Sequence, residues 1–182
     1  MKDLSLHILD IANNSIRAGA SLVTLTITEN TDDDTLIICI TDDGCGMTEE
    51  ELKMASDPFF TSRKTRKVGL GIPLFKQNAE QTGGWVKLQS TKGKGTRIEA
   101  MFRLSHLDRP PMGDLASVFV LLMAGTQGVE FELNYATPVG KYSISSVEIK
   151  DILDDVPLTE IEVQKQIEGL ILSNLLEIRY TK

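Results

Sequence analysis

Residues 36–40 form an unbroken apolar run, and an acidic, glycine-rich segment follows almost at once at residues 42–46. An apolar run of this length, rich in Ile, is suited to a strand in the middle of a sheet. The segment after it places the carboxylate of Asp42 at a strand end, and Gly44 and Gly46 allow the backbone to approach a flat ligand. Taken alone, the pattern also fits an ordinary hairpin turn, because many hairpin turns have a similar sequence.

The elements around this strand follow from the period of the apolar residues. Leu4, Ile8 and Ile11 recur at intervals of three and four, which predicts a helix over residues 3–18. Other segments alternate as strands or begin with helix-capping residues. They predict a strand over 22–28, a short helix over 48–56, an irregular loop over 57–67, a helix over 71–82 and strands over 85–89 and 97–102.

The first predicted helix carries a polar stripe opposite its apolar side. The stripe shares one helix face because its members are spaced by four, three, four and three residues: Asp3, His7, Asp10, Asn14 and Arg17. Without further clues, the more common interpretation of such a stripe is a solvated surface.

A second glycine pair, Gly69 and Gly71, stands where a helix begins. Free backbone N–H groups and the helix dipole make such a place suited to phosphate. The six residues 62–67 before it hold four cations, which usually indicates a solvated surface but gains a phosphate-binding interpretation beside this helix start. A further turn, Gly93-Lys94-Gly95-Thr96, indicates little by itself.

The order of these four motifs resembles that of the GHKL superfamily, which contains gyrase B-type ATPases, heat-shock chaperones, sensor histidine kinases and MutL. The resemblance covers residues 3–103. It implies an α/β two-layer sandwich in which helices cover one face of a mostly antiparallel sheet. It also implies that ATP and Mg²⁺ bind between the helices and a short lid at residues 47–68, and we expect ATP to order the cationic part of this lid.

The resemblance assigns roles to single residues as well. Asn14 would give its side-chain oxygen to Mg²⁺, and Asp10 stands where relatives carry the glutamate that activates water, although Asp is one methylene shorter. Arg17 would contact phosphate. Asp42 would accept the adenine amino group and so select adenine over guanine, and Thr96 would lie near the adenine-bound water. The other nucleotide-binding residues that it implies are Gly44, Gly46, Met47, Phe60, Lys64, Gly69, Leu70 and Gly71.

Two consecutive prolines, Pro110 and Pro111, mark a boundary because they cannot continue a helix or a central strand. We therefore expect an ATP-binding domain over residues 1–105 and a small α/β module over residues 112–182. In this module, residues 129–135 and 142–144 alternate as a hairpin. One helix face carries Val163, Ile167, Leu170, Ile171, Leu175 and Ile178. The module would hold a protein partner or a second copy of the chain.

Charge and cysteine content argue against other function classes. The net charge of −7 disfavours nucleic acid as a partner, because such affinity rests on Lys and Arg. Cys39 and Cys45 lack metal-ligand spacing, and we expect both to be reduced thiols. The sequence shows neither a signal peptide nor an apolar stretch of about 18 residues, so we expect a cytoplasmic location without membrane contact.

These features favour a GHKL-type enzyme, either an ATPase or a kinase that acts on a protein in trans, as stand-alone anti-sigma-type serine kinases do. The alternative is a regulatory module that exchanges ATP and ADP without turnover. Asp10 separates the two hypotheses, because only an enzyme needs a base there. We expect His7 to support Asp10 from the same helix, whereas nothing around His106 indicates a role.

Overall fold

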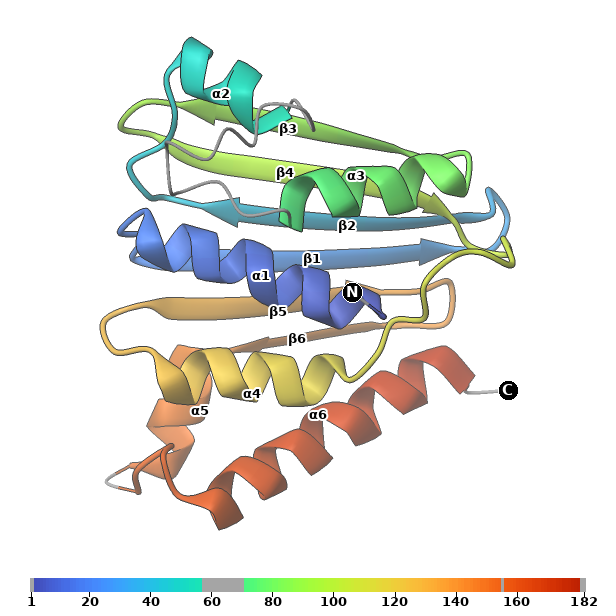
Figure 1. Ribbon diagram of the computed structural model, residues 1–182. Helices are drawn as coiled ribbons and strands as arrows, with labels where there is room; N and C mark the ends of the chain where they lie inside the picture. Colours follow the sequence, from blue (N-terminus) through green and yellow to red (C-terminus); the bar gives the residue numbers. More distant parts are fainter. Residues whose placement is uncertain (1, 57–70, 155, 181–182) are drawn as a thin grey trace.

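The computed structural model describes residues 2–56, 71–154 and 156–180. Within these residues, the strands form one six-stranded sheet in the order β3-β4-β2-β1-β5-β6 (Figure 1). Neighbouring strands are antiparallel except β1 and β5, which run parallel. The strands are β1 (Leu22–Asn30), β2 (Thr35–Asp42), β3 (Trp85–Thr91), β4 (Gly95–Arg103), β5 (Glu130–Ala136) and β6 (Lys141–Ser145).

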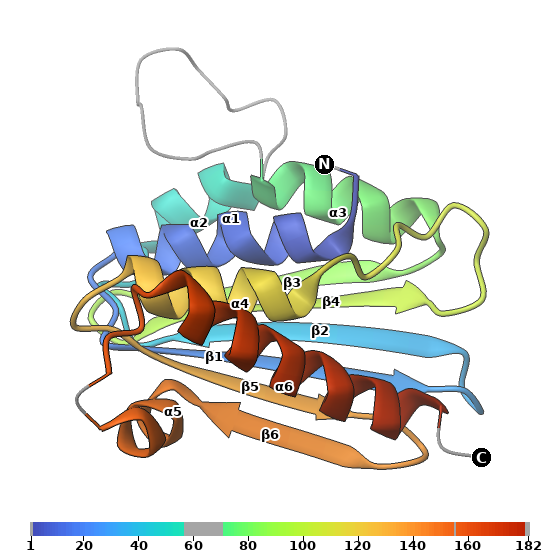
Figure 2. The ribbon, with the colours of Figure 1, turned by 90° about the horizontal axis from the view of Figure 1, so that it is seen from below.

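In the described part of the chain, the helices are α1 (Leu4–Arg17), α2 (Glu49–Ser56), α3 (Gly71–Gln81), α4 (Leu115–Gly125), α5 (Ser146–Leu153) and α6 (Ile161–Tyr180). Helices α1, α3 and α4 lie over one face of this sheet, and α5 and α6 lie at its β6 edge (Figure 1). Helices α3, α1 and α4 lie next to one another across the sheet, and α6 packs beside α4 (Figure 2). The predicted α/β sandwich, with a mostly antiparallel sheet and helices on one face, is confirmed.

Alternation along the strands explains why the helices cover only one face. In β1, Val23, Leu25 and Ile27 are buried, whereas the three threonines at positions 24, 26 and 28 are half-buried on the other face. Strand register carries this pattern across the sheet, since Ile27 lies opposite Ile38 of β2, which lies opposite Ala100 of β4. These side chains belong to one core between the sheet and its helices.

The segment after the two prolines joins the same sheet. β5 pairs with β1 along most of that strand, and β6 pairs with β5 as the predicted hairpin, which is confirmed. The backbone N–H groups of Leu4 and Ser5 donate to the carbonyl oxygens of Pro111 and Met112 at 2.9 and 2.8 Å. Sheet and core therefore continue past the prolines, and the division into an ATP-binding domain and a separate module stays a prediction.

Most other elements agree with the sequence prediction to within a few residues. One agreement matters for the site, because β2 extends through Asp42, so this residue ends the strand as the sequence predicts. Helix α5 was not predicted. It begins with a capping box in which Ser145 Oγ accepts from the Glu148 N–H and the Glu148 carboxylate accepts from the Ser145 N–H. The predicted loop at 57–67 lies outside the described residues.

Candidate functional site

Three polar side chains meet at the end of the sheet where β2 finishes. Asp42 lies opposite Thr96 of β4, and Thr96 lies opposite Ser90 of β3, so the three occupy one row across neighbouring strands. Ser90 Oγ and Thr96 Oγ1 are 2.9 Å apart and form a hydrogen bond. The Met47 N–H donates to Ser90 Oγ at 2.8 Å. Strand register thus brings Asp42 and Thr96 together and adds Ser90, and the Met47 backbone joins this row through Ser90.

Asp42 is held as a hydrogen-bond acceptor. It is 9% exposed, Ser15 Oγ of α1 donates to its Oδ2 at 2.6 Å, and the Gly44 N–H donates to its Oδ1 at 3.0 Å. Because each carboxylate oxygen can accept more than one hydrogen bond, both oxygens keep capacity for a further donor. A Cβ on Gly44 would lie 3.0 Å from the Cβ of Ala18, so glycine also allows the turn to pack against the end of α1.

Gly46 and Gly95 fix two turns against each other beside Asp42. Their φ angles are +59° and +94°, values that favour glycine. A Cβ added to Gly46 would lie 2.0 Å from the carbonyl oxygen of Thr91, and one added to Gly95 would lie 1.9 Å from that of Asp42. Glycine is therefore required at both positions by backbone packing, apart from any approach of a ligand.

The carboxylate of Asp10 lies against the first residue of α3. A Cβ added to Gly71 would come within 1.8 Å of Asp10 Oδ2, so any other residue here would displace this carboxylate. The N-terminal end of a helix presents free N–H groups and a positive partial charge. Residues 10 and 71, which belong to two different predicted motifs, are thus neighbours in space.

His7 lies one turn before Asp10 and is fully buried. Its Nε2 is 2.8 Å from the side-chain nitrogen of Asn78, and its ring packs against Phe75 with 5.3 Å between centroids. Within the described residues, its Nδ1 has no hydrogen-bond partner. Burial lowers the pKa of His7, although the nearby carboxylates of Asp10 and Asp3 act in the opposite direction. The polar stripe of α1 is therefore not simply a solvated face.

Asn14 and Arg17 complete the stripe at the other end of α1. Arg17 Nη1 donates to Asn14 Oδ1 over a long 3.4 Å, and Arg17 itself is exposed. Asn14 is half-buried and lies one turn after Asp10, so the two residues present side-chain oxygens on the same helix face. Oxygen donors of this kind are the ligands that Mg²⁺ prefers.

Some predicted residues fall on the part of the chain that is not described. These are Phe60, Lys64, Gly69 and Leu70, together with residues 57–68 of the predicted lid, which lie outside the described residues. Two residues of the site were missed by sequence reasoning. Ser15 contacts Asp42, and Ser90 contacts Thr96. Both contacts depend on tertiary structure, and no sequence spacing signals a contact across 27 residues such as that of Ser15 with Asp42.

A sequence profile of the family described as histidine kinase-, DNA gyrase B-, and HSP90-like ATPase matches residues 2–106. The chain belongs to this family. The match includes α1 through β4 and ends before α4. An ATP-binding domain of the GHKL type therefore forms the first part of the chain, and the row of polar residues at the end of β2 lies within it.

Similar proteins match a part of the chain in sequence. A putative sensor protein of Shewanella frigidimarina (strain NCIMB 400) is 40% identical over 73 residues, which are 40% of this chain and 11% of that protein. The sensor histidine kinase ZraS of Salmonella typhi is 34% identical over 89 residues, which are 48% of this chain and 19% of that protein. The chain thus spans less than a fifth of the length of either relative.

One solved structure that the chain matches is the N-terminal domain of a DNA repair protein, with a TM-score of 0.48 and 17% identity over 79% of this chain and 52% of that one. Across the described ranges, the helices of the chain are too short or too polar to pass through a lipid bilayer.

Proposed function

We propose that the chain binds ATP together with Mg²⁺ among the residues of α1, the end of β2 and the start of α3. Asp42 carries this proposal. Ser15 and Gly44 hold its carboxylate at a strand end with acceptor capacity left over, and the exocyclic amino group of adenine is a donor that fits it. Guanine presents a carbonyl oxygen at that place, which a carboxylate would repel.

The stripe of α1 and the start of α3 would serve the phosphates and the metal ion. Asn14 would give one oxygen ligand to Mg²⁺, which usually keeps several waters and takes its other ligands from phosphates. Gly71 stands at a helix N-terminus suited to phosphate, and the exposed Arg17 would exchange its long bond to Asn14 for a phosphate. We also assign Phe60, Lys64, Gly69 and Leu70 to the nucleotide, with Gly46, Met47 and Thr96 around the base.

We propose Asp10 as the base that accepts a proton from an attacking water or from a hydroxyl of a protein substrate. Its carboxylate lies against Gly71, at the helix end that would hold phosphate. The proteins with similar sequences include a sensor histidine kinase. This similarity supports phosphoryl transfer as an alternative to hydrolysis. The remaining residues of the chain, 112–182, would engage a protein partner, and an ATP-dependent role fits a cytoplasmic location.

Calorimetric titration with ATP and GTP in the presence of magnesium tests the binding site. The intact chain should bind ATP and discriminate against GTP. Asp42→Asn should weaken ATP roughly ten- to a hundred-fold, because loss of a charge-assisted acceptor that leaves a donor unpaired costs about 1.5–3 kcal/mol. Asn14→Ala should abolish the magnesium-dependent part of the affinity.

Two variants serve as matched controls for this titration. Asp32→Asn makes the same change in an exposed turn, and Asn13→Ala removes the neighbouring amide of α1, whose Nδ2 donates to the Leu9 carbonyl. Both should keep the affinity of the intact chain for ATP. Equal affinity for ATP and GTP in the intact chain would refute the role of Asp42, and incubation with labelled ATP would separate an enzyme from a module without turnover.

A further inference from the structure

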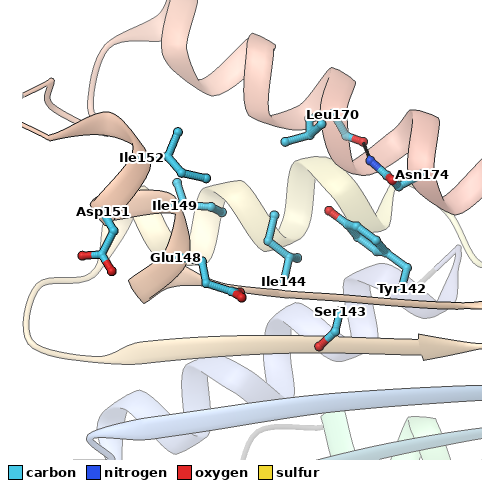
Figure 3. A pocket seen from close by; sticks show the side chains of 9 residues that line it. All are labelled: Tyr142, Ser143, Ile144, Glu148, Ile149, Asp151, Ile152, Leu170 and Asn174. Atoms are coloured by element: carbon cyan, nitrogen blue, oxygen red, sulfur yellow. Dashed lines mark hydrogen bonds between the residues drawn. The ribbon is translucent and has the colours of Figure 1, made fainter.

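A cavity of about 490 Å³ opens between β6, α5 and α6, away from the residues assigned to the nucleotide. Figure 3 shows that Ile144 of β6, Ile149 of α5 and Leu170 of α6 point into it from three sides. The volume is within the range of sites that bind ligands, about 300–1,000 Å³. We call this space the β6 groove.

The floor of the β6 groove is an edge of the sheet. Among the described strands, β6 pairs only with β5, so one side of its backbone has no strand partner. In Figure 1, α5 and α6 lie farther from the centre of the sheet than β6 does, and Figure 2 shows the two helices beside the strand. A folded neighbour would meet these helices first, whereas a single extended chain fits between them.

The walls of the groove are apolar and its rim is acidic. Ile152 and Leu170 remain 79% and 50% exposed, so two aliphatic side chains stand in water beside the groove. The charged residues that line it are Glu148 and Asp151, with no cation among the lining residues. The buried hydroxyl of Tyr142 has no hydrogen-bond partner within the described residues.

Tyr142 can act as a hydrogen-bond donor at the floor of the groove. Burial raises the pKa of Tyr142 to about 12, and the negative charge of Glu148 contributes to this shift. The phenol is therefore protonated at neutral pH. A buried donor without an acceptor is unfavourable, and a shift of the ring that exposes the hydroxyl would let a carbonyl oxygen of an incoming chain accept from it.

We propose that the β6 groove binds an extended peptide segment of a partner protein, which pairs with β6 as an added strand. Alternate apolar side chains of the segment enter between Ile144, Ile149 and Leu170, and its Lys or Arg side chains meet Glu148 and Asp151. A second copy fits less well, because a symmetric contact would bring the same acidic rim to both sides and each chain carries a net charge of −7. The proposal names the kind of partner for residues 112–182 and does not depend on ATP.

A synthetic probe tests this proposal on the full chain without nucleotide. The probe is a fluorescein-labelled, end-blocked peptide of eight residues in which Val and Lys alternate, and fluorescence anisotropy measures its binding. We expect saturable binding that weakens as salt rises, because the rim carboxylates contribute. Leu170→Asn should weaken binding at least ten-fold, whereas Leu172→Asn, with a matched exposure of 51% on another side of α6, should leave it unchanged.

Two further comparisons separate strand pairing from general attraction. N-methylation of alternate peptide bonds blocks one edge of the probe, so the two possible methylation patterns should differ strongly in affinity. Glu148→Gln combined with Asp151→Asn should weaken binding and flatten its salt dependence, because both rim charges are lost. Gln at position 148 keeps the capping box of α5, so the helix should remain folded. The same variants should bind ATP as the intact chain does, which separates this result from the nucleotide site.

Three outcomes would overturn the proposal. One is the absence of saturable binding up to about 1 mM probe, a free energy near −4 kcal/mol. A second is equal affinity of Leu170→Asn and Leu172→Asn, or of the two methylation patterns. The third is a stable dimer in sedimentation that Leu170→Asn dissociates, since the groove would then hold a second copy of the chain.

Discussion

The imidazole of His7 connects two helices at the site. It lies on α1, contacts Phe75 and Asn78 of α3, and stands one turn before Asp10. Since Asp10 in turn lies against Gly71, the two helices meet through His7 at one point and through Asp10 at the next. The prediction that His7 supports Asp10 stays a prediction, but its burial has a consequence that can be measured.

His7 should make the stability of the chain depend on pH. Its pKa is lowered by burial in the folded state, whereas in the unfolded state it lies near 6.5. As the pH falls below about 6.5, the unfolded chain binds a proton that the folded chain does not, so the free energy of unfolding decreases. The decrease is at most about 1.4 kcal/mol per pH unit for one group and ends at the folded pKa.

Urea unfolding at pH 7.5, 6.5 and 5.5 would measure this effect. In His7→Gln the contribution of this group to the slope should vanish, because glutamine does not titrate, even though the absolute stability also falls. His106→Gln is the matched substitution, because these are the two histidines of the chain. If His7→Gln keeps the full slope of the intact chain, His7 is not the group that titrates.

Some site residues could be predicted from the sequence and others could not, for a physical reason. Asp10 and Asn14 share a helix face by spacing alone, and Gly71 opens a helix by local pattern. Ser90 reaches Thr96 through strand register, which depends on how β3 and β4 pair. Contacts set by tertiary register leave no periodic signal in the sequence.

At the scale of elements, the end of α6 is fastened to two strands. Tyr135 of β5 donates a hydrogen bond from its hydroxyl to Glu29 of β1, and Arg179 of α6 forms an ion pair with the same carboxylate at 2.9 Å. Tyr135 is 2% exposed, and its pKa is raised by burial and by the bond to Glu29. Thr137 Oγ1 also donates to the carbonyl of Ile178.

Glu29→Ala should release this end of α6. It leaves the buried hydroxyl of Tyr135 without its acceptor, which costs about 1–3 kcal/mol in the free energy of unfolding. Hydrogen exchange should rise in the last turns of α6. The exposed Glu50→Ala is the matched change and should have little effect. In a double-mutant cycle with Tyr135→Phe, additive losses would contradict a coupled contact.

Most elements were predicted well, whereas the short helix α5 was missed and the pairing of distant strands was not predicted. The helix face of Val163, Ile167 and Ile171 predicted α6, and these residues are buried. The two prolines indicated a boundary, and they lie in the connection between β4 and α4, but they did not indicate that β5 after them pairs with β1. Local pattern marks where an element ends but does not say which strand it joins.

At the scale of the molecule, we expect the whole chain to unfold as one unit. Removal of everything after residue 106 would expose the edge of β1 that pairs with β5 and would uncover the core beneath α4. The fragment 1–106 should therefore associate through this edge or lack a cooperative transition. In the full chain, Trp85 fluorescence, which reports on β3, should change together with far-UV circular dichroism.

Two separate transitions in the full chain would contradict this expectation and would support independent folding of residues 1–105 and 112–182. A monomeric 1–106 fragment with a sharp transition would do the same. The unfolding of the fragment should also be measured with Mg²⁺ and ATP present, because bound ligand stabilises a folded state by mass action and would reveal a fragment that can fold.

The parallel pairing of β1 with β5 also determines the order in which the sheet can form during synthesis on the ribosome. Thr24 Oγ1 donates to Glu132 Oε2 across this pair, and the two residues are 108 positions apart in the chain. At a synthesis rate of about 5–20 residues per second, β1 emerges roughly 5–20 s before its partner. The hairpin of β1 with β2 can form as soon as both strands have emerged, and it includes the end of β2 that carries Asp42. The other edge of β1 remains unpaired until β5 has been synthesised.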